Sequence, residues 1–199
     1  MSWSGLTGLR PEDGFALAMI DPPWRFKTFS AKGINAKGAG GQYRTMTLDE
    51  IKAMPLREIM ARDSWIWLWA TNPQLDQAFD VLSAWGATFS TAGHWAKRTR
   101  RGLLAFGTGH VLRCAGEPFL IGKFGKPKVV ARNIRSVIEG PLREHSRKPD
   151  EAFHEAARMV QPGAAKIEIF SRQERPGWAV FGDEIERFGA VPGCNGGEV

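Results

Sequence analysis

Apolar runs and helical periodicities alternate along this chain. Residues 15–20 (FALAMI) and 64–70 (SWIWLWA) are short, continuous apolar runs, and the first ends at Pro22 and Pro23. Such runs are typical of strands buried on both faces of a sheet. The remaining pattern predicts further strands around residues 89–96, 110–114, 118–124, 166–170 and 178–181.

Three helices are predicted between these strands. Thr47 and Glu50 have the spacing of a capping box, with Ile51, Leu56 and Ile59 as the inward positions that follow. A second helix is predicted over residues 73–85, with Gly86 as its C-cap and Leu75, Phe79 and Leu82 at helical spacing. A third is predicted from Pro149 to Val160 and ends before Pro162-Gly163.

This order of elements predicts the fold class. Strands that alternate with helices favour an α/β fold with a mostly parallel sheet, flanked by helices and binding ligands at the carboxyl ends of its strands. We expect a single domain over residues 1–188 and a disordered tail over 189–199. Residues 27–44 lack periodicity and predict a long functional loop, and residues 125–148 read as irregular.

Composition narrows the class of protein. Of 199 residues, 43% are hydrophobic and 24% charged, which is typical of a soluble globular domain. The apolar runs are too short for a transmembrane helix, and no secretory signal is visible. Two cysteines favour a reducing cytoplasm over a disulfide framework. The four histidines and two cysteines lack zinc-ligand spacing, so we expect no metal.

The charge suits a polyanionic partner. The formal net charge is +6, and the basic residues gather in three clusters between positions 97 and 148. A solvated basic face is the alternative interpretation. Most of the eight tryptophans are expected in the core, with one or two available for stacking on a base. The clusters are Lys97, Arg98, Arg100 and Arg101; Lys123, Lys126, Lys128, Arg132 and Arg135; and Arg143, Arg147 and Lys148.

The run Asp21-Pro22-Pro23-Trp24 carries the candidate chemistry. The prolines stiffen the backbone and remove two N–H donors, which leaves the Asp21 carboxylate and the proline carbonyls as acceptors. Trp24 adds a flat apolar face. This combination suits a planar base with an exocyclic amine, whose hydrogens donate to the acceptors while its ring stacks on the indole. A simple strand end with Trp24 in the core is the alternative.

Downstream motifs make the chain similar to a known family. In order and spacing, Asp21 to Glu184 resembles the MT-A70 family of N6-adenine methyltransferases, in the form of a compact prokaryotic or phage-type member. Besides Asp21-Pro22-Pro23-Trp24, the matches are Tyr43-Arg44-Thr45-Met46, Leu68-Trp69-Ala70-Thr71-Asn72, Trp85-Gly86, Trp95-Ala96-Lys97, Gly107-Thr108-Gly109-His110, Glu117, Ser146-Arg147-Lys148-Pro149, Lys166-Ile167-Glu168-Ile169-Phe170-Ser171-Arg172, Gly177-Trp178 and Gly182-Asp183-Glu184.

The resemblance implies a Rossmann-like class I methyltransferase fold with permuted motif order, in which the catalytic strand precedes most of the cofactor pocket. It implies S-adenosyl-L-methionine as cofactor and methyl transfer to N6 of adenine. The implied catalytic residues are Asp21, Pro22, Pro23 and Trp24. The implied cofactor-binding residues are Met19, Ile20, Asp21, Lys148, Glu168, Phe170, Arg172, Asp183 and Glu184.

The substrate side is assigned in the same way. Trp24, Tyr43 and Glu117 resemble residues that border the target base, and His110 is expected in a substrate loop. Lys97, Arg98, Arg100 and Arg101 are the candidate phosphate contacts. Gln173-Glu174-Arg175 departs from the His-Asn that often contacts the ribose in this family, and Asp183 replaces an asparagine.

Several alternatives stay open on the sequence alone. N4 of cytosine presents a similar amine, and a catalytically silent nucleic-acid-binding subunit is a second reading. DNA is expected rather than RNA, with a flipped or single-stranded base. A homodimer or helper protein is plausible, and the expected location is the cytoplasm of a prokaryotic or phage-infected cell.

Overall fold

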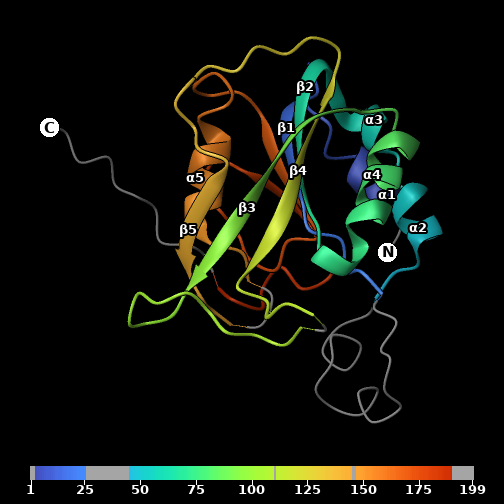
Figure 1. Cartoon of the computed structure of the whole chain (residues 1–199). Coiled ribbons are helices and arrows are strands. Elements are labelled where there is room, and N and C mark those ends of the chain that lie inside the picture. Colours follow the sequence, from blue (N-terminus) through green and yellow to red (C-terminus); the bar gives the residue numbers. More distant parts are fainter. Residues whose placement is uncertain (1–2, 26–44, 110, 145–146, 190–199) are drawn as a thin grey trace, which may run out of the picture.

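A computed structural model describes residues 3–25, 45–109, 111–144 and 147–189 (Figure 1). Its centre is a seven-stranded sheet in the order β5-β3-β4-β2-β1-β6-β7. The strands are β1 (Phe15–Ile20), β2 (Met60–Trp69), β3 (Thr88–Arg98), β4 (Gly116–Phe124), β5 (Val137–Pro141), β6 (Lys166–Ile169) and β7 (Ala179–Phe181).

The sheet is mixed, with parallel pairing predominant. β1 pairs in parallel with β2 and β6, β6 with β7, and β3 with β5. Only β4 runs against its neighbours β2 and β3. The carboxyl ends of six strands therefore meet at one edge, together with the amino end of β4. We call this edge the carboxyl edge, and it faces downward in Figure 1.

Helices cover the two faces of the sheet. On one face lie α1 (Trp3–Thr7), α2 (Leu48–Lys52), α3 (Leu56–Ile59), the short 3₁₀ helix η3 (Asn72–Gln74) and α4 (Leu75–Ala84), and on the other lies α5 (Asp150–Ala157) (Figure 1). Successive side chains of β1 point to opposite faces of the sheet and pack into the two cores in turn. Ala18 and Ile20 pack with the α1–α4 core, and Leu17 and Met19 with the α5 core. A strand buried on both sides must be apolar throughout, which explains FALAMI.

The predicted strands around 15–20, 64–70, 89–96, 118–124, 166–170 and 178–181 are confirmed, with β2 beginning earlier, at Met60. The strand expected over 110–114 is wrong, because residues 111–114 form bends and irregular backbone. His110 lies outside the described residues. The region read as irregular contains β5, which pairs with β3 through Trp95 and Ile138.

The structure confirms the predicted starts of α2 and α5. Thr47 and Glu50 form the reciprocal capping box, and Pro149 is the N-cap of α5. The inward face of α4 differs from the prediction. Ala78, Val81 and Leu82 are buried, whereas Phe79 is 40% exposed and packs edge-on against Phe89. No helix within the described ranges has the length and apolarity needed to cross a membrane.

Candidate active site

Asp21 directly follows β1, an interior strand of the sheet, and therefore lies at the carboxyl edge. Its own N–H donates to the Ile169 carbonyl of β6, so the backbone stays in the sheet up to this residue. The next turn is then held by two further bonds. The Trp24 N–H donates to the Pro22 carbonyl at 2.8 Å, and the Met46 N–H donates to the Pro23 carbonyl at 2.9 Å. The proline pair is a rigid turn, as the sequence predicted.

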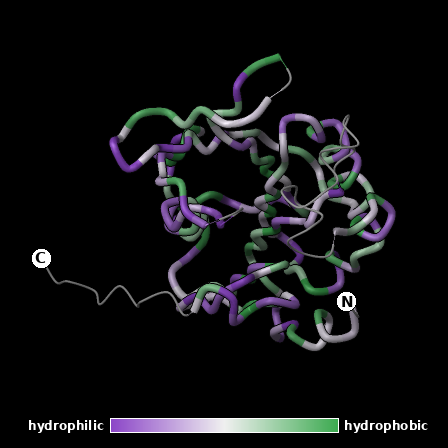
Figure 2. The backbone as a smooth tube through the Cα atoms, turned by 90° about the horizontal axis from the view of Figure 1, so that it is seen from below, coloured by the Kyte–Doolittle hydropathy of each residue, from purple (hydrophilic) through white to green (hydrophobic). Residues whose placement is uncertain are grey.

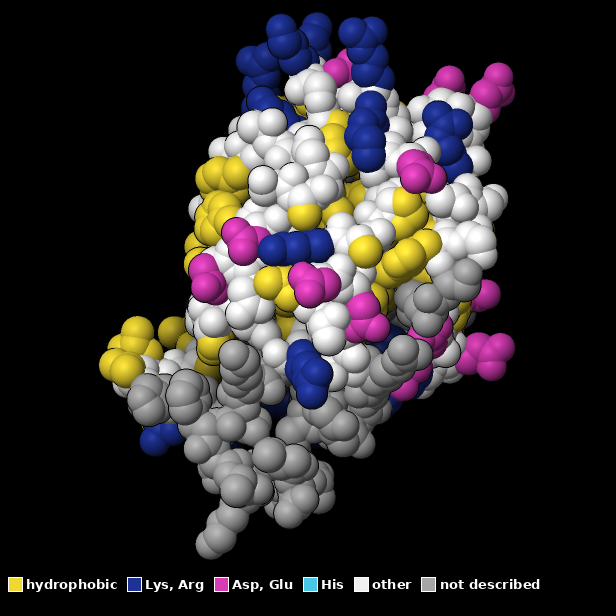
Figure 3. All heavy atoms as spheres, turned by 90° about the vertical axis from the view of Figure 1, so that its right-hand side faces the viewer, with side chains coloured by type: hydrophobic (Ala, Val, Ile, Leu, Met, Phe, Trp, Pro, Cys, Tyr) yellow, Lys and Arg dark blue, Asp and Glu magenta, His cyan; other side chains and the backbone are white. Residues whose placement is uncertain are grey.

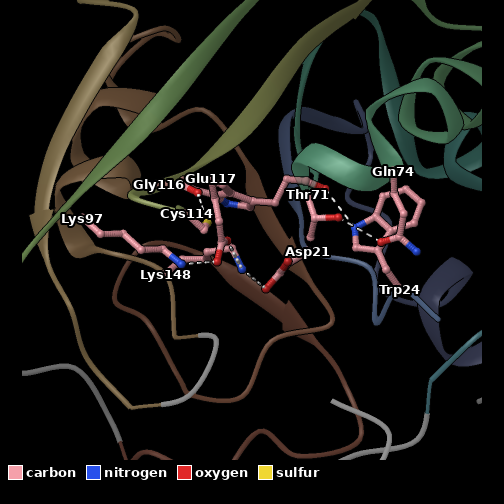
Figure 4. A network of polar contacts seen from close by, with 10 residues as sticks. Asp21, Trp24, Thr71, Gln74, Lys97, Cys114, Gly116, Glu117 and Lys148 are labelled. Carbon is pink, nitrogen blue, oxygen red and sulfur yellow. Dashed lines mark hydrogen bonds and ion pairs between the residues drawn. The ribbon is translucent and has the colours of Figure 1, made fainter. Parts of the chain in front are cut away.

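A chain of alternating charges extends from Asp21 (Figure 4). The Nζ of Lys148 lies 2.7 Å from Oδ2 of Asp21 and 3.1 Å from Oε2 of Glu117. The other oxygen of Glu117, Oε1, lies 2.5 Å from Nζ of Lys97. One charged side chain thus comes from each of four places: the end of β1, β4, β3 and the segment before α5. The ion pairs bring together residues that lie far apart in the sequence.

The pKa values follow from burial and from these partners. Burial raises the pKa of Asp21 above its ordinary value, although Lys148 opposes the rise. Burial also disfavours the Glu117 carboxylate, but Lys148 and Lys97 outweigh it and lower the pKa of Glu117 to about 2. Burial disfavours the Lys148 ammonium, yet Asp21 and Glu117 raise its pKa overall. Of the two carboxylates in this chain, Asp21 is therefore the one that is more readily protonated.

A small pocket opens beside Asp21 and contains most of the predicted cofactor residues. It is bordered by side chains from the ends of β1 and β6, from the start of α5, and from the segments around them. The lining residues are Asp21, Arg147, Lys148, Phe153, Glu168, Phe170, Arg172, Gln173, Arg175 and Phe188. Of these, Asp21, Lys148, Glu168, Phe170 and Arg172 were predicted. The other five, Arg147, Phe153, Gln173, Arg175 and Phe188, were not predicted to bind the cofactor.

The backbone of the pocket is strained at one position. Phe170 has φ 65°, and no other non-glycine residue among those described has a positive φ. Such a conformation costs about 1–3 kcal/mol and concentrates at functional sites. Its neighbour Ser171 donates its N–H to the Phe181 carbonyl of β7 and its hydroxyl to the Gln173 carbonyl. The turn after β6 is thereby held with the Phe170 ring at the pocket.

Glu168 and Arg175 both line the pocket and are paired with each other. Their side chains are 14% and 5% exposed, and Nε of Arg175 lies 3.5 Å from Oε2 of Glu168. Arg175 also donates to Oδ1 of Asp150 at 2.9 Å and lies over the Phe153 ring. Burial raises the pKa of Glu168 to about 7, against the effect of Arg175. Oε2 of Glu168, Nη2 of Arg175 and Oε1 of Gln173 are buried without a hydrogen-bond partner. Polar atoms of this kind suit a polar ligand.

Trp24 does not present the open face that the sequence predicted. Its side chain is 4% exposed within the core, and its indole N–H donates to the Trp69 carbonyl at 3.2 Å. In Figure 4 Trp24 lies beside Thr71 and Gln74, on the far side of Asp21 from Lys148. A ring enclosed in this way offers no surface for stacking on a base. Trp24 instead ties the end of β1 to the end of β2.

Other predicted cofactor residues lie outside the pocket. Met19 and Ile20 belong to β1, pair with both β2 and β6, and have fully buried side chains. Their backbone pairs with a strand on each side, and neither residue lines the pocket, so the contact of their main chain with a cofactor stays a prediction. Asp183 is exposed, and Glu184 pairs with Arg187 at 2.6 Å. Neither lines the pocket.

The basic residues divide between the two ends of the sheet. Lys97 and Arg98 end β3 at the carboxyl edge, where Lys97 pairs with Glu117 and Arg98 with Glu139. Arg100 and Arg101 follow and are exposed. The cluster from Lys123 to Arg135 follows β4 and therefore begins at the opposite edge. Figure 3 shows Lys and Arg side chains gathered at that upper end of the molecule. Tyr43 and His110 lie outside the described residues.

Two pocket residues, Arg175 and Phe153, carry no local signal in the sequence. Arg175 stands where the sequence departs from a family motif, and nothing near it predicts its burial against Phe153. Phe153 reads as the inward face of a helix, and nothing in its spacing marks a pocket. Within the described ranges, no group of three or more His, Cys, Asp or Glu side chains is arranged to hold a metal ion.

The chain is similar in sequence to proteins named as N(6)-adenosine and N(6)-adenine methyltransferases. The N(6)-adenosine-methyltransferase subunit METTL3 of Danio rerio is 30% identical over 177 residues, which cover 86% of this chain and 28% of that protein. The N(6)-adenosine-methyltransferase MT-A70-like protein of Drosophila melanogaster is 30% identical over 177 residues, covering 86% and 27%. The N(6)-adenine-specific methyltransferase METTL4 of Mus musculus is 28% identical over 189 residues, covering 87% and 38%.

The chain thus spans only 27–38% of the length of these relatives. Its mixed sheet with helices on both faces is the Rossmann-like fold of class I methyltransferases. A family model for MT-A70 matches residues 15–184, which include Asp21, Glu117, Lys148 and the whole sheet. From this match and the relatives together, the chain belongs to the MT-A70 family.

Proposed function

We propose that this chain transfers a methyl group from S-adenosyl-L-methionine to the N6 amino group of adenine in nucleic acid, with DNA as the favoured polymer. One observation carries the proposal. Asp21, Lys148, Glu168, Phe170 and Arg172, which are dispersed over the sequence, line a single pocket at the carboxyl edge. The relatives named as N6-adenosine and N6-adenine methyltransferases support the same reaction.

The residues of the pocket fit the proposed cofactor. S-adenosyl-L-methionine supplies an electrophilic methyl group on a sulfonium ion and carries a carboxylate, a ribose and an adenine. Lys148 would attract the carboxylate, and Glu168 would accept hydrogen bonds from ribose hydroxyls. Phe170, Phe153 and Phe188 would provide an apolar border for a flat ring. Buried polar atoms of Gln173 and Arg175 that lack a hydrogen-bond partner support a polar ligand at this place.

Asp21 and Pro22 would hold the target amine. The lone pair of an adenine amine is delocalised into the ring, so the nitrogen is a poor nucleophile. Two acceptors, the Asp21 carboxylate and the Pro22 carbonyl, would draw on its two hydrogens and direct its lone pair out of the plane. Lys148 fixes the carboxylate at 2.7 Å. Catalysis by this chain would then consist of positioning and of preorganised electrostatics, without a covalent protein intermediate.

The charge of the carboxyl edge supports a nucleic-acid substrate. Arg100, Arg101 and Arg113 are exposed there, next to the ion-paired Lys97. Since an adenine inside a duplex cannot reach Asp21, the substrate would be a flipped or single-stranded base. The choice of DNA rests on the resemblance to compact prokaryotic and phage members. A homodimer or a helper protein and a cytoplasmic location are proposed on the same basis.

Mass spectrometry of nucleosides tests the function directly. The purified chain is incubated with S-adenosyl-L-methionine and either single-stranded DNA, duplex DNA or RNA of matched sequence, and the products are digested. We expect N6-methyldeoxyadenosine, formed faster on single-stranded than on duplex DNA. Methylation of RNA alone would overturn the choice of DNA, and N4-methylcytosine alone would overturn the choice of adenine.

Two further measurements separate the alternatives. D21A should remove the product while calorimetry still detects binding of S-adenosyl-L-methionine, because Lys148, Glu168 and Phe170 remain. If the wild-type chain binds nucleic acid but no S-adenosyl-L-methionine, it is a silent partner subunit and the proposed activity is wrong.

A further inference from the structure

The segment between β3 and β4, here called the arm (residues 99–109 and 111–115), projects from the carboxyl edge (Figure 2). Its root is well held. The Ala105 N–H donates to the Lys97 carbonyl at 2.8 Å, the Gly107 N–H to the Cys114 carbonyl at 2.8 Å, and the Lys97 N–H to the Ala115 carbonyl at 2.9 Å. Ala105 is buried. The arm is therefore anchored rather than loosely attached.

The outer part of the arm exposes large apolar side chains. Phe106 is 81% exposed, Val111 87% and Leu112 82%, with Leu103 and Leu104 at 65% and 54%. Burying one such side chain contributes about 1.5–3 kcal/mol, so this concentration of exposed apolar side chains indicates a binding surface. The guanidinium of Arg113 lies 5.5 Å from the centre of the Phe106 ring, which leaves most of that ring open.

The charge of the arm favours one class of partner. Arg100, Arg101 and Arg113 are exposed, and the sequence contains no Asp or Glu from residue 99 to residue 116. A second copy docking through the same face would bring these arginines against one another without a carboxylate between them. A polyanion with flat apolar groups, which is a nucleic-acid strand with unpaired bases, complements both the arginines and the aromatic ring.

The arm is also connected to the candidate active site. Its root is Lys97, and the chain Lys97–Glu117–Lys148–Asp21 links this root to the catalytic carboxylate through successive ion pairs. The root of the arm and Asp21 therefore lie at the same edge of the sheet.

We propose that the arm binds the nucleic-acid strand next to the target adenine, with Phe106 stacked on a neighbouring unpaired base and Arg100, Arg101 and Arg113 at phosphates. This inference rests on the proposed function and adds to it the element that would keep the strand open. Apolar side chains inserted between bases serve this purpose in other proteins, and stacking on an aromatic side chain typically stabilises a bound base by about 1–3 kcal/mol.

Fluorescence anisotropy with a labelled, adenine-containing single-stranded deoxyoligonucleotide tests the inference. Compared with wild type, F106A should raise Kd about tenfold, and F106W should restore it to within about twofold. F89A is the matched control, because Phe89 is 43% exposed at the other end of β3. The slope of log Kd against log salt should be unchanged in F106A and reduced by about 0.7 in R101Q.

The outcomes separate the two proposals. If F106A binds the oligonucleotide as wild type does, the arm has no stacking role. If F106A instead dissociates an oligomer in sedimentation while Kd is unchanged, the arm is a protein interface and the inference is wrong. If the chain methylates nucleic acid but F106A leaves the Kd unchanged, the proposal about the arm is wrong and the proposed function stands. If F106A raises the Kd but the wild-type chain methylates no nucleic acid, the proposed function is wrong and the arm still binds the strand.

Discussion

The ammonium of Lys148 lies 2.7 Å from the carboxylate of Asp21, although the two residues are 127 positions apart in the chain. Lys148 precedes α5 on one side of the sheet, and Asp21 directly follows β1. Their ion pair connects the cofactor side of the candidate site with the acceptor that would hold the target amine. It also affects how the activity should respond to pH.

As the pH is lowered, methyl transfer should be lost at a higher pH than it would be if Asp21 had the pKa of an ordinary aspartate. Burial raises the pKa of Asp21 above 3.8, and a protonated Asp21 has lost the negative charge that would accept from the amine. We therefore expect single-turnover rates to fall as the pH decreases through this raised pKa. K148M, measured at saturating cofactor, should move the midpoint further up, because the charge of Lys148 lowers the pKa of Asp21. A midpoint that moves down in K148M would contradict the assignment.

Removal of the charge on Glu117 should destabilise the folded chain. Its carboxylate lies between Lys97 and Lys148, which are 16% and 7% exposed at their side chains. E117Q leaves both ammonium groups with one partner fewer, and we expect a loss of about 3 kcal/mol in the free energy of unfolding. Urea denaturation measures it. In a double-mutant cycle, K97M should cost less in the E117Q background than in wild type, and strict additivity would exclude the coupling.

Glu168 should make stability depend on pH. Its pKa rises from 4.5 in the unfolded chain to about 7 in the folded one, so folding favours its protonated form. The stability that this group contributes is complete below pH 4.5 and is lost as the pH rises to about 7, a change of about 3 kcal/mol. In urea denaturation, the free energy of unfolding of E168Q should therefore rise relative to that of wild type by about 3 kcal/mol between pH 4.5 and pH 8. A constant difference between the two proteins would show that Glu168 is not protonated on folding.

Trp24 should act as an anchor of the catalytic turn. W24F keeps the ring but loses the bond from the indole N–H to the Trp69 carbonyl, and we expect a loss of about 1 kcal/mol in unfolding free energy. W85F is the matched control, since the buried Trp85 indole donates to the Ile51 carbonyl at 3.0 Å. Both variants should lose similar stability, but only W24F should lower kcat. Equal kcat in W24F and wild type would show that this bond does not position Asp21.

Local signals in the sequence predicted local structure well. The capping box of Thr47 and Glu50 formed because both of its hydrogen bonds close within one helical turn. The strand at 15–20 formed where an apolar run ends in two prolines. The face of α4 was harder to predict. Leu75, Phe79 and Leu82 fit a helical stripe, but contacts with the sheet selected Ala78, Val81 and Leu82 as the buried positions. The neighbours that made this selection are distant in the sequence.

The sequence predicted only part of the candidate site, because the contacts that form the pocket also join residues distant in the sequence. Asp21 and Lys148 were assigned through motifs, and the pocket brings them together with Glu168 and Phe170. Met19, Ile20, Asp183 and Glu184, which were also predicted to bind the cofactor, do not line this pocket. A motif marks a stretch of chain, but it does not say whether a side chain at the end of a strand turns into the sheet or into the pocket.

The sequence by itself determined the alternation of strands and helices, the rigid acceptor turn after residue 20 and the basic character of the segment after residue 97. These depend on neighbours within a few positions, and hydrophobic periodicity, proline and charge report them directly. Only the tertiary structure decided that β4 runs against its neighbours, that Trp24 is an anchor in the core, and that Lys97, Glu117, Lys148 and Asp21 form one charged chain. Ion pairs and ring packing of this kind depend on distances between residues far apart in the sequence, which exist only after the sheet has formed.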